Sequence, residues 1–208
     1  DYLRANNKTV FVNLDDALQV EKSKDINKFS FGLNNSNANL NILSVTANPF
    51  VTIDFEDENV QSKLIGIYNA NNINAAIAIG KHFNISNSEI KNAIENYIPE
   101  NNRSQLITKN SNQIILDAYN ANPSSMKVAI ENFLQLENPN KLLILGDMFE
   151  LGSESLAEHK KMIELLVSES QIEIYFVGKD FFANKIASKN MHFYENYELF
   201  AVDFKKQT

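Results

Sequence analysis

The sequence predicts an α/β protein in which a β-rich first part precedes a parallel sheet covered by helices. From about residue 113 onward, short apolar runs alternate with helical segments, the pattern of a parallel sheet with helices on both faces. Before residue 66 the apolar runs have the composition and alternation of strands. We therefore expect the first 66 residues to supply part of a sheet rather than a complete domain.

The first part contains three segments with strand-like composition and two helical segments. The strands are expected at residues 9–13, 41–46 and 51–55. Alanine and isoleucine recur at helical spacing over residues 72–83, and Ser86 with Glu89 forms a capping-box pattern before a second helix that runs to about Tyr97. Pro99 ends that helix.

Residues 99–103 are polar and begin with a helix breaker, so a domain boundary is expected there. The predicted domains are residues 1–102 and 103–208. In the second, the expected strands are residues 113–116, 141–145, 172–177 and 191–194. Helices are expected from Pro123 to about residue 138, from Ser153, and over residues 180–189. The second half is therefore predicted to be Rossmann-like, without a glycine-rich dinucleotide fingerprint.

Composition excludes several classes of function. The chain has a formal net charge of −7 and only two arginines, Arg4 and Arg103, so no basic stripe is available for nucleic acid. It has no cysteine, which rules out a disulfide framework and thiolate metal sites. No His, Asp or Glu grouping has metal-ligand spacing, and no metal site is predicted within the chain.

No apolar run approaches the length of a membrane span, and the first residues are not a signal peptide. We therefore expect a soluble, cytoplasmic protein. The sequence begins without an initiator methionine, which suggests a piece of a longer protein.

Two strings occur where a strand-like run gives way to a helix-like one. They are Asp-Ala-Tyr-Asn-Ala-Asn-Pro at residues 117–123 and Leu-Gly-Asp-Met-Phe-Glu-Leu-Gly at residues 145–152. Because loops at the carboxyl ends of parallel strands meet in one crevice, both strings are candidate ligand loops.

These two strings, together with Tyr-Asn-Ala-Asn-Asn at residues 68–72, Asn-Arg-Ser at residues 102–104 and His159, resemble the Mur ligases of cell-wall synthesis. Their order and spacing match that family across most of the chain, and especially its members that add D-Ala-D-Ala. The resemblance implies the end of a central ATPase-type domain followed by most of a C-terminal domain. It also implies ATP and Mg²⁺ as cofactors, with UDP-MurNAc-tripeptide and D-Ala-D-Ala as substrates of a monomeric enzyme.

Asp117 can accept hydrogen bonds from a ribose diol, and the matching aspartate of the family contacts the ribose. From its position alone, Asp117 is about equally well explained as a residue that caps a turn. Tyr119 and Asn120 follow on the same loop, where the resemblance places them near the nucleotide phosphates; loop packing is the alternative for both.

Asn69 and Asn72 open a helix, and their amides can read the edge of adenine or simply cap the helix. Tyr68 stands where some relatives have histidine. The guanidinium of Arg103 can hold ATP phosphates or ribose, as the family match favours, or lie solvated in the connecting segment.

The substrate side rests on five residues. Asn122 is more simply read as a helix cap before Pro123. The carboxylates of Asp147 and Glu150, next to Met148, can receive the ammonium of a dipeptide or cap the following helix. His159 falls on an apolar helical spacing that favours packing over acid–base chemistry. No catalytic residue can be assigned.

The sequence contains no phosphate-binding loop of the Gly-x-x-x-x-Gly-Lys-Ser/Thr type. The resemblance puts that loop, the Mg²⁺ ligands and the UDP-sugar domain upstream of residue 1. We therefore expect a fragment of an amide ligase that acts through an acyl phosphate and is inactive alone. Two alternatives stay open: another ligase of the superfamily that adds an amino acid, and a noncatalytic module that binds adenosine or a protein.

Overall fold

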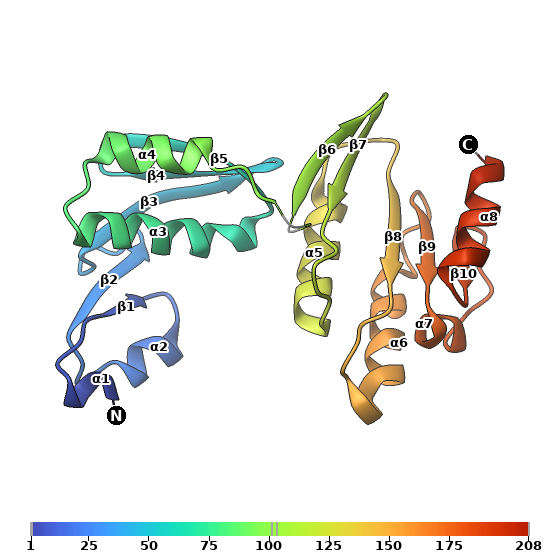
Figure 1. Cartoon of the computed structure of the whole chain (residues 1–208), viewed down its shortest axis with the longest axis horizontal. Helices are drawn as coiled ribbons and strands as arrows, with labels where there is room; N and C mark the ends of the chain where they lie inside the picture. The colour runs from blue at the N-terminus through green and yellow to red at the C-terminus, as the bar shows by residue number, and fades with distance from the viewer. Residues whose placement is uncertain (1, 101, 103, 208) are drawn as a thin grey trace. The chain divides into compact units, whose positions relative to one another are not determined.

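The computed structural model describes residues 2–100, 102 and 104–207. The chain divides into two compact units, Asp1–Asp117 and Ala118–Thr208 (Figure 1). The predicted boundary lies earlier, after residue 102, and it stays a prediction.

A five-stranded sheet forms the frame of the first unit, in the order β1-β2-β3-β4-β5. Strands β1 to β3 are parallel, whereas β3, β4 and β5 pair antiparallel. The strands are β1 (Val10–Asn13), β2 (Lys28–Leu33), β3 (Leu40–Ala47), β4 (Phe50–Phe55) and β5 (Glu58–Ile65). Alternation in β4 buries Val51, Ile53 and Phe55 on one face, which gives the sheet its core side.

The first unit also contains helical segments. They are α1 (Tyr2–Ala5), α2 (Ala17–Lys22), the 3-10 turn η1 (Ile67–Asn69), α3 (Ala70–His82) and α4 (Asn87–Asn96). Helix α3 packs against β1 to β4, and α4 packs against the edge strand β5 (Figure 1). Ile73 and Ile77 of α3 and Ile90 of α4 join the core of the sheet. The predicted capping box of Ser86 and Glu89 is present at the start of α4.

An antiparallel hairpin, β6 (Gln105–Lys109) and β7 (Asn112–Leu116), completes the first unit. Its open end pairs Gln105 with Leu116. The residues just outside that pair, Ser104 and Asp117, are therefore neighbours although the hairpin separates them in the sequence.

The second unit has a three-stranded parallel sheet in the order β10-β9-β8. Its elements are α5 (Pro123–Gln135), β8 (Leu142–Gly146), η2 (Gly152–Glu154), α6 (Ser155–Leu166), β9 (Glu173–Val177), α7 (Lys179–Ala183), β10 (Met191–Tyr194) and α8 (Tyr197–Gln207). Helices α5 and α6 contact each other, and α7 contacts β9 and β10. A separate apolar core, which includes Ile130, Leu166 and Phe176, fills the space between sheet and helices.

The predicted α/β class with parallel strands is confirmed. The order of strands and helices in the second half also agrees. However, the strand expected at residues 113–116 lies in the antiparallel hairpin β6–β7 rather than in the parallel sheet, and α7 ends at Ala183 rather than continuing to residue 189. The elements α1, α2, β2, β5, β6 and α8 were not expected from the sequence. No helix in the described part of the chain is long and apolar enough to cross a membrane.

Candidate functional site

A cavity of about 730 Å³ lies in the first unit where β1 ends and α3 begins. Asn13, Asp15 and Asp16 line it from the end of β1, and Asn71 and Asn72 line it from the first turn of α3. The carboxyl ends of parallel strands are where open α/β sheets bind ligands. The volume lies in the range of small-molecule sites, so this polar cavity has the position and size of a ligand site.

Asn69 and Asn72 have different surroundings at the start of α3. Asn69 is buried, and its amide nitrogen donates to the carbonyl oxygen of Ile65 at 2.8 Å. Its side-chain oxygen accepts from the amide nitrogen of Asn72 at 3.2 Å. Asn69 therefore ties η1 to the end of β5 and orients Asn72, which is exposed and lines the cavity. A role in adenine recognition stays a prediction for both.

Sequence reasoning missed the contribution of residues 13–16 and of Asn71 to this cavity. The amide of Asn13 donates to Asn71 at 3.4 Å, which joins the end of β1 to α3. The carboxylate of Asp15 accepts from the backbone of Leu33 at 2.9 Å, which joins it to the end of β2. The Asn-Leu-Asp-Asp string at residues 13–16, at the end of a predicted strand, could have indicated this site. It did not stand out because asparagine is abundant throughout the chain.

Asp117 follows β7 directly and is exposed in its unit. One carboxylate oxygen, Oδ1, accepts from the backbone N–H of Ser104 at 3.2 Å. Arg103 is also a predicted nucleotide contact, but it lies outside the described residues.

Tyr119 and Asn120 lie in the loop between β7 and α5, and both are exposed. Asn122 ends that loop as the N-cap of α5, where its side-chain oxygen accepts from the backbone N–H of Ser125 at 2.9 Å. The hydroxyl of Ser125 lies 3.2 Å from the backbone nitrogen of Asn122, which completes a reciprocal cap. The simpler interpretation of Asn122, helix capping, therefore describes its contacts here.

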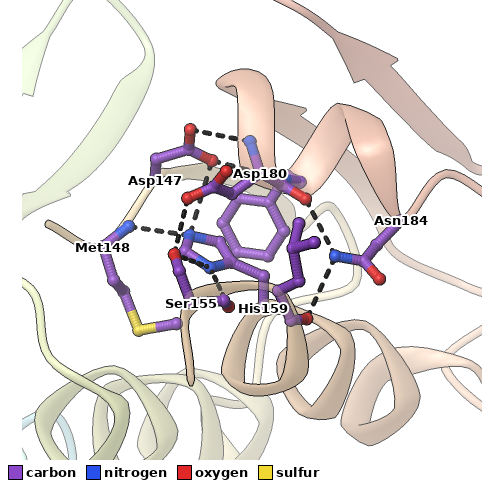
Figure 2. Close-up of polar contacts among 8 residues, drawn as sticks. Asp147, Met148, Ser155, His159, Asp180 and Asn184 are labelled. Carbon is purple, nitrogen blue, oxygen red and sulfur yellow. Dashed lines mark hydrogen bonds and ion pairs between the residues drawn. The ribbon is translucent and has the colours of Figure 1, made fainter. Parts of the chain in front are cut away.

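The loop after β8 is held by a polar cluster in the second unit (Figure 2). Asp147 points at the start of α7, where its two carboxylate oxygens accept from the backbone N–H groups of Asp180 and Phe181 at 3.0 and 3.1 Å. These are donors that a helix start leaves unpaired, and a carboxylate also suits the positive end of the helix. Asp147 thus caps α7 rather than the helix that follows it in sequence.

His159 lies beneath the same loop and is fully buried. Its Nε2 accepts from the backbone N–H of Met148 at 2.9 Å, and Nδ1 lies 2.7 Å from the carbonyl oxygen of Ser155. A ring that accepts at Nε2 and donates from Nδ1 is neutral. The 3.5 Å approach of Asp147 to Nε2 is therefore not an ion pair in this arrangement.

The four predicted substrate residues around this loop differ in exposure. Met148 and His159 are buried, Asp147 is half-buried, and Glu150 is exposed. Glu150 has a left-handed backbone with φ of 63°, and Gly152 has φ of 56°. Between these turns and the buried Met148, Phe149 is 77% exposed. Glu150 is thus the predicted acidic residue that the loop presents to solvent.

Asp147, His159 and Asp180 have ligand atoms within 4.8 Å of one another. The single lone pair of His159 Nε2 already accepts from the amide of Met148, so the histidine is not free to bind a metal, and the carboxylates are engaged as well: Asp147 accepts from two backbone amides and Asp180 from the hydroxyl of Ser155 at 2.5 Å. The set also differs from the octahedral oxygen ligands that Mg²⁺ takes. The cluster therefore does not fit the Mg²⁺ that the resemblance implies, and its contacts join the β8 loop, α6 and α7.

Comparison with known proteins shows which family the chain resembles. Residues 102–203 match the family described as Mur ligase, glutamate ligase domain. Over 122 residues, or 59% of its length, the chain is 31% identical to a UDP-N-acetylmuramoyl-tripeptide–D-alanyl-D-alanine ligase of Treponema pallidum. Residues 102–203 of this chain thus belong to the Mur ligase family.

Two further relatives match over a longer part of this chain. The UDP-N-acetylmuramoyl-tripeptide–D-alanyl-D-alanine ligase of Buchnera aphidicola is 35% identical over 140 residues, which cover 65% of this chain and 30% of the relative. The MurT subunit of a lipid II isoglutaminyl synthase from Staphylococcus aureus is 28% identical over 147 residues, which cover 70% of this chain and 33% of that protein. These alignments cover about a third of each relative.

Solved Mur ligase structures have the same fold. MurF of Acinetobacter baumannii superposes with a TM-score of 0.77 at 23% identity, over 97% of this chain and 46% of that one. MurF of Thermotoga maritima, solved in complex with ADP, gives a TM-score of 0.73 at 20% identity over 97% of this chain and 48% of that one. At these identities the likeness shows the fold alone. The chain spans about half the length of these structures.

Proposed function

We propose that this Mur ligase chain is part of an ATP-dependent enzyme that joins D-Ala-D-Ala to UDP-MurNAc-tripeptide in peptidoglycan precursor synthesis. The observation that carries the proposal is the shared activity name of the relatives from Treponema pallidum, Buchnera aphidicola and Bacillus subtilis, at 31–35% identity. We further propose that the whole enzyme is a cytoplasmic monomer.

The first unit would bind the nucleotide. The cavity at the start of α3 supports this role, because the amides of Asn72 and its neighbour Asn71 line it and can pair with the edge of a purine. Asp117 would accept from the ribose diol, with Arg103, Tyr119 and Asn120 near the phosphates. The ADP in the Thermotoga relative is consistent with a nucleotide site in such proteins. The Mg²⁺ ligands would come from outside this chain.

The loop after β8 would receive the dipeptide. Glu150 is exposed there and can pair with an ammonium group, whereas Asp147 and His159 would act by holding the loop in shape. Their hydrogen bonds to backbone amides fix the loop without requiring contact with substrate. Asn122 would contribute through the cap that fixes the start of α5.

In the proposed reaction, the tripeptide carboxylate attacks the γ-phosphorus of ATP, which releases ADP and forms an acyl phosphate. The amine of D-Ala-D-Ala then attacks the acyl carbon, the C–O bond to phosphate breaks, and the amine loses a proton as phosphate leaves. Catalysis of this kind rests on placing the reactants and on stabilising the charge that develops. No residue of this chain is assigned a proton-transfer step.

The test is phosphate release by the full-length protein that contains this chain, with ATP, Mg²⁺ and UDP-MurNAc-tripeptide. Release that depends on D-Ala-D-Ala would support the proposal. A Glu150→Gln variant should raise the KM for D-Ala-D-Ala more than the KM for ATP, and a Glu137→Gln variant, altered at an exposed position after α5, is the matched control. Equal effects of the two variants would contradict the role given to Glu150.

A second ligase function has support from the MurT relative, which is a subunit of a glutamine-hydrolysing lipid II isoglutaminyl synthase. Release of phosphate with a single amino acid or with ammonia, but not with D-Ala-D-Ala, would move the assignment to such a ligase. No release with any pairing would favour a noncatalytic adenosine- or protein-binding module.

We also propose that the 208-residue chain is inactive alone, because its sequence lacks the lysine-containing phosphate loop. ATP-dependent formation of the UDP-MurNAc-pentapeptide by the purified chain would contradict this proposal.

A further inference from the structure

Tyr68 is held in one orientation at the start of α3. Its ring lies against Gly66, where an added Cβ would be 2.4 Å from Cε1 of the ring. Gly66 has φ of 86°, a conformation that other residues rarely adopt. The backbone before η1 is thus shaped to receive this ring, which fixes the direction of the tyrosine hydroxyl.

The hydroxyl of Tyr68 lies 2.5 Å from Oγ of Ser104, the residue just before β6. Ser104 is 5% exposed and has a left-handed backbone with φ of 49°. That conformation is unfavourable for a residue with a Cβ, so surrounding contacts must hold it. Tyr68 supplies such a contact through the serine side chain.

The backbone N–H of Ser104 donates to Oδ1 of Asp117 at 3.2 Å. Pairing of Gln105 with Leu116 brings these two residues together at the open end of the hairpin. A chain of contacts thus runs from Tyr68 through Ser104 to Asp117, all within the first unit. The carboxylate keeps further lone pairs with which to accept hydrogen bonds.

The protonation of Tyr68 favours the same arrangement. Burial raises the pKa of Tyr68, the hydrogen bond with Ser104 lowers it, and the negative charge of Asp117 raises it, so the net direction is upward. The hydroxyl therefore keeps its proton at neutral pH and can serve as a donor.

We propose that Tyr68, acting through Ser104, is a positioning residue that orients the carboxylate of Asp117 to accept the ribose diol of a nucleotide. The inference rests on the proposed nucleotide-binding function. Orientation before the ligand arrives lowers the entropy lost on binding, which is how a residue that does not touch the ligand raises affinity.

The experiment uses the chain as it is, with two variants and a matched control. Tyr68→Phe removes only the hydroxyl, and Ser104→Gly removes the serine side chain while it tolerates the left-handed backbone and keeps the amide. Tyr97→Phe is the control, because Tyr97 is an exposed tyrosine of the same unit. Titrations by saturation-transfer NMR, which detects weak binding, compare ATP with 2′,3′-dideoxy-ATP, which lacks the diol. Amide hydrogen exchange at Ser104 is measured in the tyrosine variants.

We expect Tyr68→Phe and Ser104→Gly to weaken ATP binding by about threefold to tenfold, the size of one lost hydrogen bond. Binding of dideoxy-ATP should change by less than about twofold, since the diol that Asp117 would hold is absent. Exchange of the Ser104 amide should become faster in Tyr68→Phe and stay unchanged in Tyr97→Phe.

Equal weakening of both nucleotides would overturn the inference, because a general loss of structure does not distinguish them. Unchanged exchange at Ser104 in Tyr68→Phe would also overturn it. If the unmodified chain bound both nucleotides equally, the proposed contact between Asp117 and the ribose would be wrong. The inference about Tyr68, which depends on that contact, would then be wrong as well. That result is read from the unmodified chain alone, so the two failures are distinguishable.

Discussion

At the scale of single residues, Gly178 and Asp147 show how closely the cluster around α7 is packed. Gly178 has φ of 145°, and a Cβ placed there would lie 2.1 Å from Cγ of Asp147. Because the carboxylate must reach the backbone amides of Asp180 and Phe181, it needs the space that glycine leaves. The glycine is therefore part of the cap of α7.

We expect Gly178→Ala to lower the free energy of unfolding by at least about 2 kcal/mol, from the clash and the left-handed backbone together. Gly146→Ala, one residue before Asp147, is the matched control, because a Cβ there meets no atom within 4 Å. Urea unfolding followed by circular dichroism measures both. Similar midpoints for the two variants would contradict the proposed packing.

His159 is the second residue whose role depends on the cluster. It is fully buried, accepts from the amide of Met148, and its ring meets that of Phe181 edge-on with centroids 4.6 Å apart. His159→Ala would leave a cavity and an unpaired amide. We expect a loss of about 2–4 kcal/mol in unfolding free energy.

The matched control for His159 is Lys160→Ala, which alters an exposed neighbour on the same helix and removes only a surface contact with Glu164. Its expected cost is about 0.5 kcal/mol or less. Amide exchange at Met148 gives a second readout, since it should rise in His159→Ala only. A stable His159→Ala with a slowly exchanging Met148 amide would show that the histidine does not hold the loop.

At the scale of elements, the hairpin turn between β4 and β5 is tied to the helices by Glu56. Its carboxylate accepts from Nζ of Lys81 at 2.9 Å, at the end of α3, and from the amide of Asn87 at 2.7 Å, at the start of α4. The hydrogen bond from Asn87 lowers the pKa of Glu56 most, and Lys81 lowers it further. One side chain thus joins three elements.

This pairing predicts a pH dependence. Because the pKa of Glu56 is lower in the folded than in the unfolded state, its stabilisation is present above the unfolded value near 4.5 and is lost as the pH falls through the folded value. Glu56→Gln should therefore cost about 0.5–1 kcal/mol at pH 7, allowing for solvent screening, and less at low pH. Urea unfolding at pH 7 and at low pH measures the difference.

Glu100→Gln, at an exposed position of the connecting segment, is the control for this prediction. A cost of Glu56→Gln that stays the same at both pH values would mean that the charge of Glu56 does not contribute.

At the scale of the whole molecule, each unit has its own apolar core. The first is built from β1 to β5 with α3 and α4, and the second from β8 to β10 with α5 to α7. The units divide after Asp117, whereas the family match begins at residue 102. The hairpin β6–β7 lies between these two positions. The place of the domain boundary therefore depends on whether the hairpin is assigned to the first or to the second unit.

Much of the order of elements could be predicted, because it depends on local patterns. The strand at residues 172–177 is apolar enough to be recognised alone, and Asn122 before Pro123 marks the start of α5. Strand β6 and helix α8 were missed because their burial is weak and partial, which blurs the periodicity that identifies an element.

The sequence by itself determined the α/β class, the family and the two loops, since each depends on residues that are close together in the chain. Only the tertiary structure decided what the polar side chains do. Asp147 caps a helix 33 residues away, and Tyr68 contacts a serine 36 residues away. Such partners depend on how strands and helices pack, and local sequence patterns do not contain that information. A carboxylate that caps a helix therefore cannot be told from a ligand-binding carboxylate by sequence alone.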